Sequence, residues 1–486
     1  MCARKTPLGE KTRTMLLDYI LVGTSLLAVT SGLHNDGITA MHRTRTGLRD
    51  FVFAGSKSGG IYYRVENRTD TGNRIWNEIL RSPSNDDNTE NVSRRTKNGR
   101  YPIYSITTTT TNRNDNEKDM TMLLFCGSAD RFISVWKLRL NNATTQLATT
   151  IPSSSSSNIN TLIPTSFSFE FVQKLGPHTG WVKGLVYDST NRVLHSLGCN
   201  CIESWDCSPL FLVHTNTIIK ANGSNTSNND EQENNIVQHI AKRKIESSLT
   251  LGVTLSSDLL CLCLLPSSYQ QHDSLTISGG VDGRIHAFYS NPTGIHQQPL
   301  HSTTAHNGRV NSIQYSAAMR ALLTIGNDGM LRVFTASIDQ GFQLQSKLDI
   351  GKEYKNPNDT SKKKKATAMR LTAATIIEED LNERKCVIAI GSSNGELFLV
   401  TVRNNNCNGD NSEDSFNHNN VIICQLDCGD DDKDAYCCNY YSSNNRILQN
   451  KAMIYSLTCE EEEAHGHRGR VLWIGHANGL DYQLLR

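Results

Sequence analysis

The sequence predicts an all-β protein that folds as a seven-bladed β-propeller. A short signature recurs seven times along the chain: a small residue or Gly, two or three further residues, Asp or Asn, and usually Gly. Most copies are followed by alternating apolar and polar residues, a pattern that indicates a half-buried β-strand. Because one strand–turn–strand unit is repeated, we expect blades that each bury their faces on their neighbours.

The copies of the signature differ in strength. The strongest occupy residues 127–130, 279–283 and 326–329, weaker ones occupy 55–59, 391–395 and 475–479, and a degenerate one occupies 198–206. Gly280 and Gly326 are spaced by one propeller repeat of roughly 40–45 residues. Longer intervals elsewhere imply insertions within a single ring and not additional domains.

Each blade is expected to open with an apolar strand, often after a His and a small turn, as at residues 34–37, 178–180 and 306–308. Gly in these turns permits a positive φ. The predicted blades span residues 33–65, 101–138, 176–206, 256–290, 305–336, 367–402 and 451–486. Together they make one domain over residues 15–486.

The N-terminal segment 15–29 is apolar and has no blade of its own. We expect it to supply the missing outer strand of the last blade, because such closure would remove two exposed sheet edges. The alternative is that residues 1–32 are a targeting segment, since basic residues precede the apolar stretch as in a secretory signal.

Five low-complexity stretches separate the blades. They cover residues 81–118, 141–166, 215–247, 351–366 and 403–449. Their runs of one residue type, such as Thr107–Thr111 and Lys362–Lys365, contain too little apolar surface to offset the entropy of ordering. We therefore expect disordered insertions, and the sequence leaves open whether they carry binding motifs.

Composition gives no sign of a polyanionic or membrane partner. The 49 Lys and Arg residues balance 48 Asp and Glu residues, for a formal net charge of +1, so we expect no nucleic-acid binding. Fourteen Cys residues show no framework spacing. We expect free thiols in a reducing compartment, without a metal site or a cofactor.

The segments 176–206 and 305–334 resemble the WD-repeat (tryptophan–aspartate repeat) family. The resemblance implies a hydrogen-bonded tetrad of His, Ser or Thr, Asp and Trp within a blade, with a structural role for the His. Its positions here are His178, Ser196, Asn200 and Trp205; His306, Thr324 and Asp328; Ser278 and Asp282; and Asp130 and Trp136. Asn200 stands where Asp is usual, and Phe replaces Trp in two of these blades.

Aromatic and basic residues in the predicted turns are candidates for a binding surface. Trp181 follows one His-containing turn, and Arg309 takes the same position in another blade. Arg131, Arg284 and Lys57 lie in signature turns that we expect at the same end of the ring. Aromatic and Arg side chains commonly anchor protein interfaces; the alternative is that Trp181 packs between blades and that the cations are simply solvated.

No catalytic constellation is recognisable, so we expect a non-enzymatic scaffold for protein partners, monomeric within a larger intracellular complex. Its location is expected to be cytoplasmic, and short basic runs leave nuclear import open. Residues 135–139 resemble the Trp-Asp-x-Arg box of propeller substrate receptors, with Lys137 where Asp is usual. Alternatives are therefore a substrate-recognition subunit of a cullin–RING ubiquitin ligase, or a secreted propeller.

Overall fold

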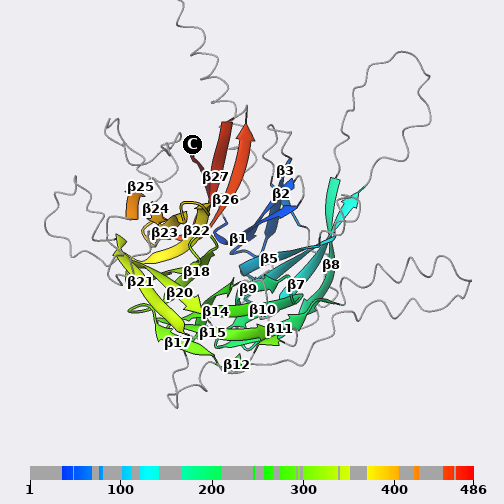
Figure 1. The fold of residues 1–486 in the computed structure, drawn as a ribbon. Coiled ribbons are helices and arrows are strands. Elements are labelled where there is room, and N and C mark those ends of the chain that lie inside the picture. Colours follow the sequence, from blue (N-terminus) through cyan, green and yellow to red (C-terminus); the bar gives the residue numbers. More distant parts are fainter. Residues whose placement is uncertain are drawn as a thin grey trace, which may run out of the picture.

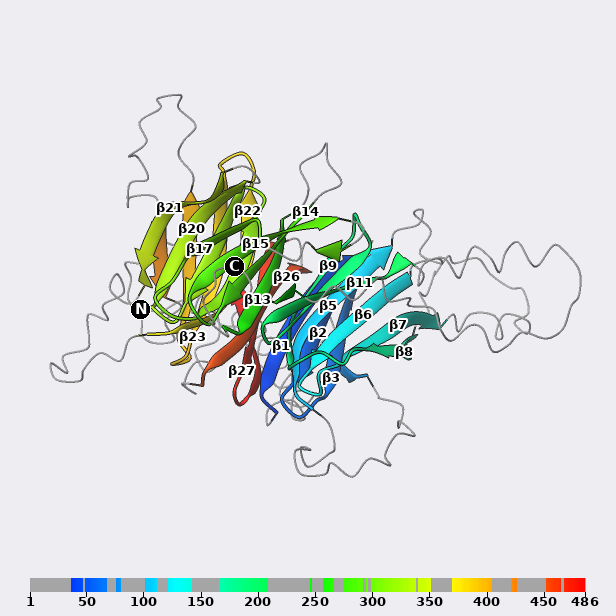
Figure 2. The same cartoon turned by 90° about the horizontal axis from the view of Figure 1, so that it is seen from below.

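A computed structural model of the chain shows seven antiparallel sheets (Figures 1 and 2). The structure describes residues 36–46, 49–67, 76–79, 101–111, 121–141, 166–208, 245–246, 257–265, 274–291, 294–295, 299–337, 340–350, 369–403, 421–425, 452–464 and 467–485. We number the sheets as blades 1 to 7 in chain order. No helix in these ranges is long and apolar enough to cross a membrane.

The first three blades are built from strands that follow one another in sequence. Blade 1 contains β1 (Ile38–Thr46), β2 (Arg49–Ser56), β3 (Ile61–Asn67) and β4 (Asn77–Glu78). Blade 2 contains β5 (Ile103–Thr111), β6 (Thr121–Ser128), β7 (Ile133–Asn141) and β8 (Ser166–Leu175). Blade 3 contains β9 (Val182–Asp188), β10 (Val193–Gly198), β11 (Cys201–Asp206) and β12 (Ile245–Glu246).

The remaining blades follow the same order. Blade 4 contains β13 (Leu259–Leu265), β14 (Ser274–Gly280), β15 (Arg284–Asn291), β16 (Gly294–Ile295) and β17 (His301–Thr304). Blade 5 contains β18 (Val310–Ser316), β19 (Ala321–Gly326), β20 (Met330–Ser337) and β21 (Gly341–Asp349). Blade 6 contains β22 (Leu371–Asp380), β23 (Lys385–Ser392), β24 (Leu397–Arg403) and β25 (Val421–Gln425); blade 7 contains β26 (Ile454–Ala464), β27 (His467–His476) and β28 (Gly479–Leu485).

The seven sheets close into a ring. The first strand of each blade contacts the first strand of the next, and β26 of blade 7 contacts β1 of blade 1. Both views show β26 and β27 (red) beside β1 (blue) (Figures 1 and 2). The predicted seven-bladed propeller is therefore confirmed.

The hydrophobic core is divided among the seven blade interfaces, with one buried cluster at each. The cluster between blades 7 and 1 joins Ile38 and Trp76 to Trp473, and the two indole rings meet edge to face at 5.3 Å between centroids. This interface also contains an ion pair, Arg64–Glu460 (2.9 Å), with both side chains buried. Among the described residues, packing between blades 7 and 1 thus closes the ring directly. The predicted closing strand, 15–29, lies outside them.

The predicted insertions differ from the structure at three places. The run Thr107–Thr111, expected to be disordered, belongs to β5, the first strand of blade 2, and Thr109 is fully packed. β-branched Thr suits a strand, but a run of one residue type shows no alternation that sequence reasoning could detect. The outer strands β12 and β25 also fall within predicted insertions, because an outer strand pairs along one edge and needs little apolar periodicity.

A bulge recurs at the start of every blade. In the pairing of the first two strands, the second residue of the first strand has no partner, so the register shifts there. These residues are Thr39, Tyr104, Lys183, Leu260, Asn311, Thr372 and Tyr455. A bulge twists the strand and redirects a side chain. The repeat therefore sets seven side chains at equivalent positions at one end of the ring.

Candidate interaction face

One end of the ring is assembled from two kinds of segment: the hairpin turns between second and third strands, and the residue just before each first strand. We call this end the turn face. In six blades the first turn residue donates its backbone N–H to the carbonyl of that preceding residue, at 2.7–3.0 Å. The pairs are Lys57–Gly37, Ala129–Pro102, Val281–Asp258, Asn327–Arg309, Ser393–Arg370 and Ala477–Met453.

Three of the bulged side chains connect their blade to the next at this end. Thr39 Oγ1 donates to the Ile103 carbonyl, Asn311 Nδ2 donates to the Leu371 carbonyl at 2.6 Å, and Thr372 Oγ1 donates to the Ile454 carbonyl at 2.6 Å. In these three bulges, the polar side-chain group is therefore occupied by a hydrogen bond to the neighbouring blade. The bulged residues of the other blades present larger side chains.

Aromatic side chains gather where blades 2 and 3 meet. Tyr104 of blade 2 stacks on Trp181 of blade 3, with ring centroids 5.5 Å apart and planes tilted by 24°. Trp181 remains 51% exposed. One ring face of Trp181 therefore packs against a neighbouring blade, and the rest of the ring is open to solvent.

Blade 7 extends this apolar surface. Met453 precedes β26 and Tyr455 is its bulged residue, and both are exposed. Burial and the nearby Tyr455 phenol raise the pKa of Tyr104 above its ordinary value. We call Met453 and Tyr455 of blade 7, Tyr104 of blade 2 and Trp181 of blade 3 the apolar arc. Of these four residues, only Trp181 was predicted from the sequence. The other three could not be assigned to the turn face, because their positions depend on where the bulge falls in each first strand.

The predicted cations lie on the turn face. Lys57, Arg131 and Arg309 are exposed there. Arg284 is half-buried and donates from Nε to Ser302 at 3.2 Å, so it supports blade 4. The structure adds Arg370, which is exposed and occupies in blade 6 the position that Arg309 occupies in blade 5.

The turn face of blade 3 contains a modified tetrad. Trp205 Nε1 donates to Ser196 Oγ at 2.8 Å, and Ser196 Oγ lies 2.9 Å from His178 Nε2. The carboxylate beside His178 Nδ1 belongs to Glu203, at 3.6 Å. No hydrogen bond among the described residues joins Asn200 to His178, so the prediction for Asn200 was wrong. Ser196 and Glu203 are cross-strand neighbours, a relation that motif spacing does not reveal.

Blade 5 contains the most complete predicted set. His306 Nε2 lies 2.9 Å from Thr324 Oγ1, and His306 Nδ1 lies 2.8 Å from Asp328 Oδ1. Arg332, unpredicted, donates to Asp328 Oδ2 at 2.8 Å. Burial opposes ionisation of Asp328, but hydrogen bonds from His306, Asn307 N–H and Arg332 hold its pKa well below the usual range. Phe334 fills the Trp position and is buried.

The other two predicted sets are not joined into tetrads. In blade 2, Trp136 Nε1 donates to Ser134 Oγ at 3.2 Å, while Asp130 accepts from Phe132 N–H and caps its own turn. In blade 4, Asp282 likewise accepts from the Arg284 N–H. Ser278 pairs across the sheet with His286. Asp130 and Asp282 are therefore turn-forming residues.

One group of described residues has the composition of a metal site. His178, Cys201 and Glu203 are buried, and their possible ligand atoms lie within 4.8 Å of one another. Cys201 Sγ donates to the Gly198 carbonyl at 3.0 Å, and His178 already contacts Ser196.

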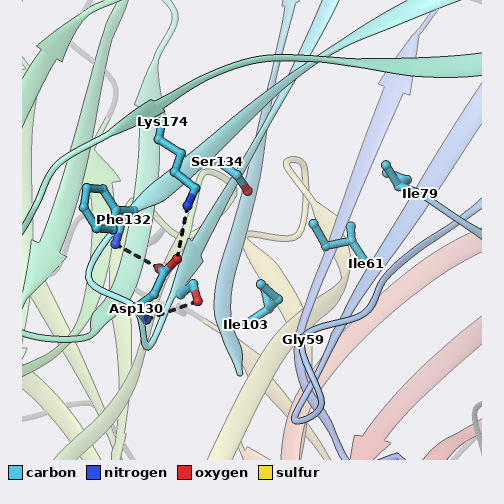
Figure 3. Close-up of a pocket in the computed structure, with 9 residues that line it drawn as sticks. Gly59, Ile61, Ile79, Ile103, Asp130, Phe132, Ser134 and Lys174 are labelled. Atoms are coloured by element: carbon cyan, nitrogen blue, oxygen red, sulfur yellow. Dashed lines mark hydrogen bonds and ion pairs between the residues drawn. The ribbon is translucent and has the colours of Figure 1, made fainter. Parts of the chain in front are cut away.

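A small hollow lies between blades 1 and 2 on the turn face (Figure 3). Lys174 and Asp130 point toward each other across its mouth, 4.0 Å apart, and the Lys174 ammonium lies 5.4 Å from the Phe132 ring centroid. Ile61 and Ile103, which line it, are nearly fully buried. The hollow thus offers little open apolar surface, and the exposed arc is the better candidate for binding.

Together these features define the chain as a seven-bladed β-propeller with an exposed turn face. No protein-family model and no curated protein sequence matches it. Among solved structures, it is similar to a chain in "Crystal Structure of Mitotic Checkpoint Complex", with 10% identity and a TM-score of 0.45 over 93% of this chain and 90% of that chain. The architecture is established by the strand topology itself.

Proposed function

We propose that this chain is a WD-repeat propeller that acts as a non-catalytic scaffold and binds protein partners through its turn face. The observation that carries the proposal is the placement of exposed apolar side chains. Three of the eight large exposed hydrophobic residues in the described part of the chain lie on the turn face: Trp181 and Met453 each precede a first strand, and Tyr455 is a bulged residue. Clustered exposed apolar groups mark interaction surfaces, and aromatic residues are favoured anchors.

Two further observations support the assignment to WD repeats and the non-catalytic role. The His178–Ser196–Trp205 and His306–Thr324–Asp328 contacts resemble the hydrogen-bonded sets of WD repeats. Because both histidines are buried within these contacts, we assign them a structural role and not a catalytic one. We place the protein in the cytoplasm or nucleus, as a monomer within a larger complex.

The test is quantitative purification of the full-length chain with its partners from the cells that express it. Trp181→Ala and Arg309→Glu should each reduce co-purification, because loss of a true anchor costs about 2 kcal/mol, or roughly 30-fold in affinity. A cullin–RING adaptor among the partners would identify the narrower role of ubiquitin-ligase substrate receptor. Loss of no partner in either variant would contradict the use of this face.

Matched controls distinguish surface loss from unfolding. Leu344→Ala removes a side chain that is 50% exposed, as Trp181 is, but on the outer strand β21. Lys347→Glu reverses an exposed charge on the same strand. Both controls should keep every partner, and all four variants should melt within a few degrees of the wild type because none removes a core side chain.

A further inference from the structure

The basic and acidic side chains of the turn face differ in whether they have partners within the protein. Lys57, Arg131, Arg309 and Arg370 are exposed, and none forms an ion pair with any residue that the structure describes. The turn face therefore presents four available cations.

The acidic groups of the same face are already occupied. Asp130 and Asp282 cap their own turns, and Asp130 also lies 4.0 Å from Lys174. Asp258 lies 3.5 Å from Lys183, and Asp328 is held by His306 and Arg332. The chain is almost neutral overall. These carboxylates keep their charge but already have partners within the protein, whereas Arg309 and Arg370 are available to an acidic group from outside the chain.

Two of the four cations lie outside the apolar arc, whereas Lys57 and Arg131 belong to blades 1 and 2. Arg309 and Arg370 precede the first strands of the adjacent blades 5 and 6. Blade 6 borders blade 7, where Met453 and Tyr455 begin the apolar arc that ends at Trp181. A ligand lying across this end of the ring meets guanidinium groups on one side and aromatic rings on the other.

We propose that the turn face binds an extended acidic segment of a partner protein, with Asp or Glu side chains on Arg309 and Arg370 and aromatic or aliphatic side chains on the arc from Met453 to Trp181. The inference rests on the proposed scaffold function and specifies the partner. Guanidinium groups pair with carboxylates through two hydrogen bonds. Nucleic acid is disfavoured because a backbone track requires many cations, whereas the side chains from Met453 to Trp181 are aromatic or aliphatic.

The experiment is selection of a random 12-residue peptide library on the purified full-length chain. Enriched peptides should combine Asp or Glu with Phe, Tyr, Trp or Leu, and the best should lose at least about tenfold in affinity on Trp181→Ala. In the double variant Arg309→Glu/Arg370→Glu, the selected charge should change from acidic to basic. The variant Lys347→Glu, on the outer strand β21, should retain the acidic preference.

The inference would be overturned by neutral or basic peptides enriched on the wild type, by no enrichment at all, or by an acidic preference unchanged in the double variant. Binding that appears only after deletion of residues 428–436, an acidic stretch of this chain, would also overturn it by identifying an internal occupant. If the double variant does not fold, Arg309→Gln/Arg370→Gln should abolish the acidic preference instead. Partners that depend on Trp181 but show no acidic segment would leave the scaffold function intact and refute only this inference.

Discussion

At the scale of single residues, the contact between His178 and Glu203 shows how a blade can keep its tetrad with an altered residue. Glu203 reaches the imidazole from the strand β11, whereas the expected Asn200 lies in the turn. Glu203 is almost completely buried. A buried carboxylate is tolerated only beside a partner that offsets its desolvation, and the His178 imidazole is positioned to do so.

We predict that Glu203→Ala lowers the free energy of unfolding by about 1–3 kcal/mol, because it removes a buried side chain that lies 3.6 Å from His178 Nδ1 and leaves a void in its place. Asn200→Ala should change it by less than about 0.5 kcal/mol, as expected for a substitution outside the buried contact network. Urea denaturation of both variants measures the difference. Equal effects would show that Asn200 shares the role assigned to Glu203.

Two histidines, the half-buried His42 and the fully buried His195, predict how stability depends on pH. Loss of hydration lowers the pKa of His42 and of His195 to about 4, below the ordinary value of 6.5. The unfolded chain therefore binds more protons than the folded chain between these pH values, and stability falls as pH decreases from about 6.5 toward 4. In His195→Gln, the decline in unfolding free energy over this range should be smaller. The same slope in wild type and variant would refute the assignment.

At the scale of elements, two strands of a blade can pair even when a long segment of sequence connects them. Cys201 and Ile202 of β11 pair with β12, although residues 209–244 intervene in the sequence. The entropy of loop closure grows only slowly with loop length. The pairing of blade strands therefore depends weakly on how much chain connects them.

Deletion of residues 222–235, which lie between β11 and β12, should accordingly shift the melting temperature by only a few degrees. Calorimetry of the full-length and deleted chains provides the measurement. Deletion of Val193–Gly198 is the contrasting control: it removes β10, whose residues are all buried, and should abolish the cooperative transition. A large loss of stability on deleting 222–235 would mean that this segment contributes to blade 3.

At the scale of the whole molecule, the contact between blades 7 and 1 determines whether the ring holds together. Arg64 of β3 donates to Glu460 Oε2 at 2.9 Å, and the same oxygen accepts from Trp473 Nε1 at 2.7 Å. The Arg64 guanidinium also lies 5.0 Å from the Trp473 ring centroid. One buried carboxylate thus connects β3 of blade 1 to β26 and β27 of blade 7.

Removing one member of this pair should destabilise the ring by roughly 3–5 kcal/mol, because the remaining charge is buried without its counter-ion. We expect Arg64→Met and Glu460→Leu each to show this loss in denaturant unfolding. The double variant should recover much of it, since apolar side chains of similar size can replace a buried ion pair. Additive losses in the double variant would show that the two residues do not act as a pair.

The sequence by itself determined the architecture, because that information is local and repeated. The turn glycines and the alternation in segments such as Ile133–Val135 and Leu331–Val333 report which face of each strand is buried, and seven copies indicate seven blades. The positions of Trp181 and Arg309 on a common face followed from the same repeat. Regular periodicity was therefore enough to predict the strands and turns whose structure depends on residues close together in the sequence.

Only the tertiary structure decided which residues meet across strands and blades. Glu203 beside His178, Arg332 beside Asp328, and the Arg64–Glu460 pair all depend on register or ring closure. The Thr107–Thr111 strand and the arc of Met453, Tyr455 and Tyr104 also lacked a periodic signal. The physical reason is that a blade's fold depends on local patterning, whereas the turn face is formed by residues from several blades that come together only when the ring closes.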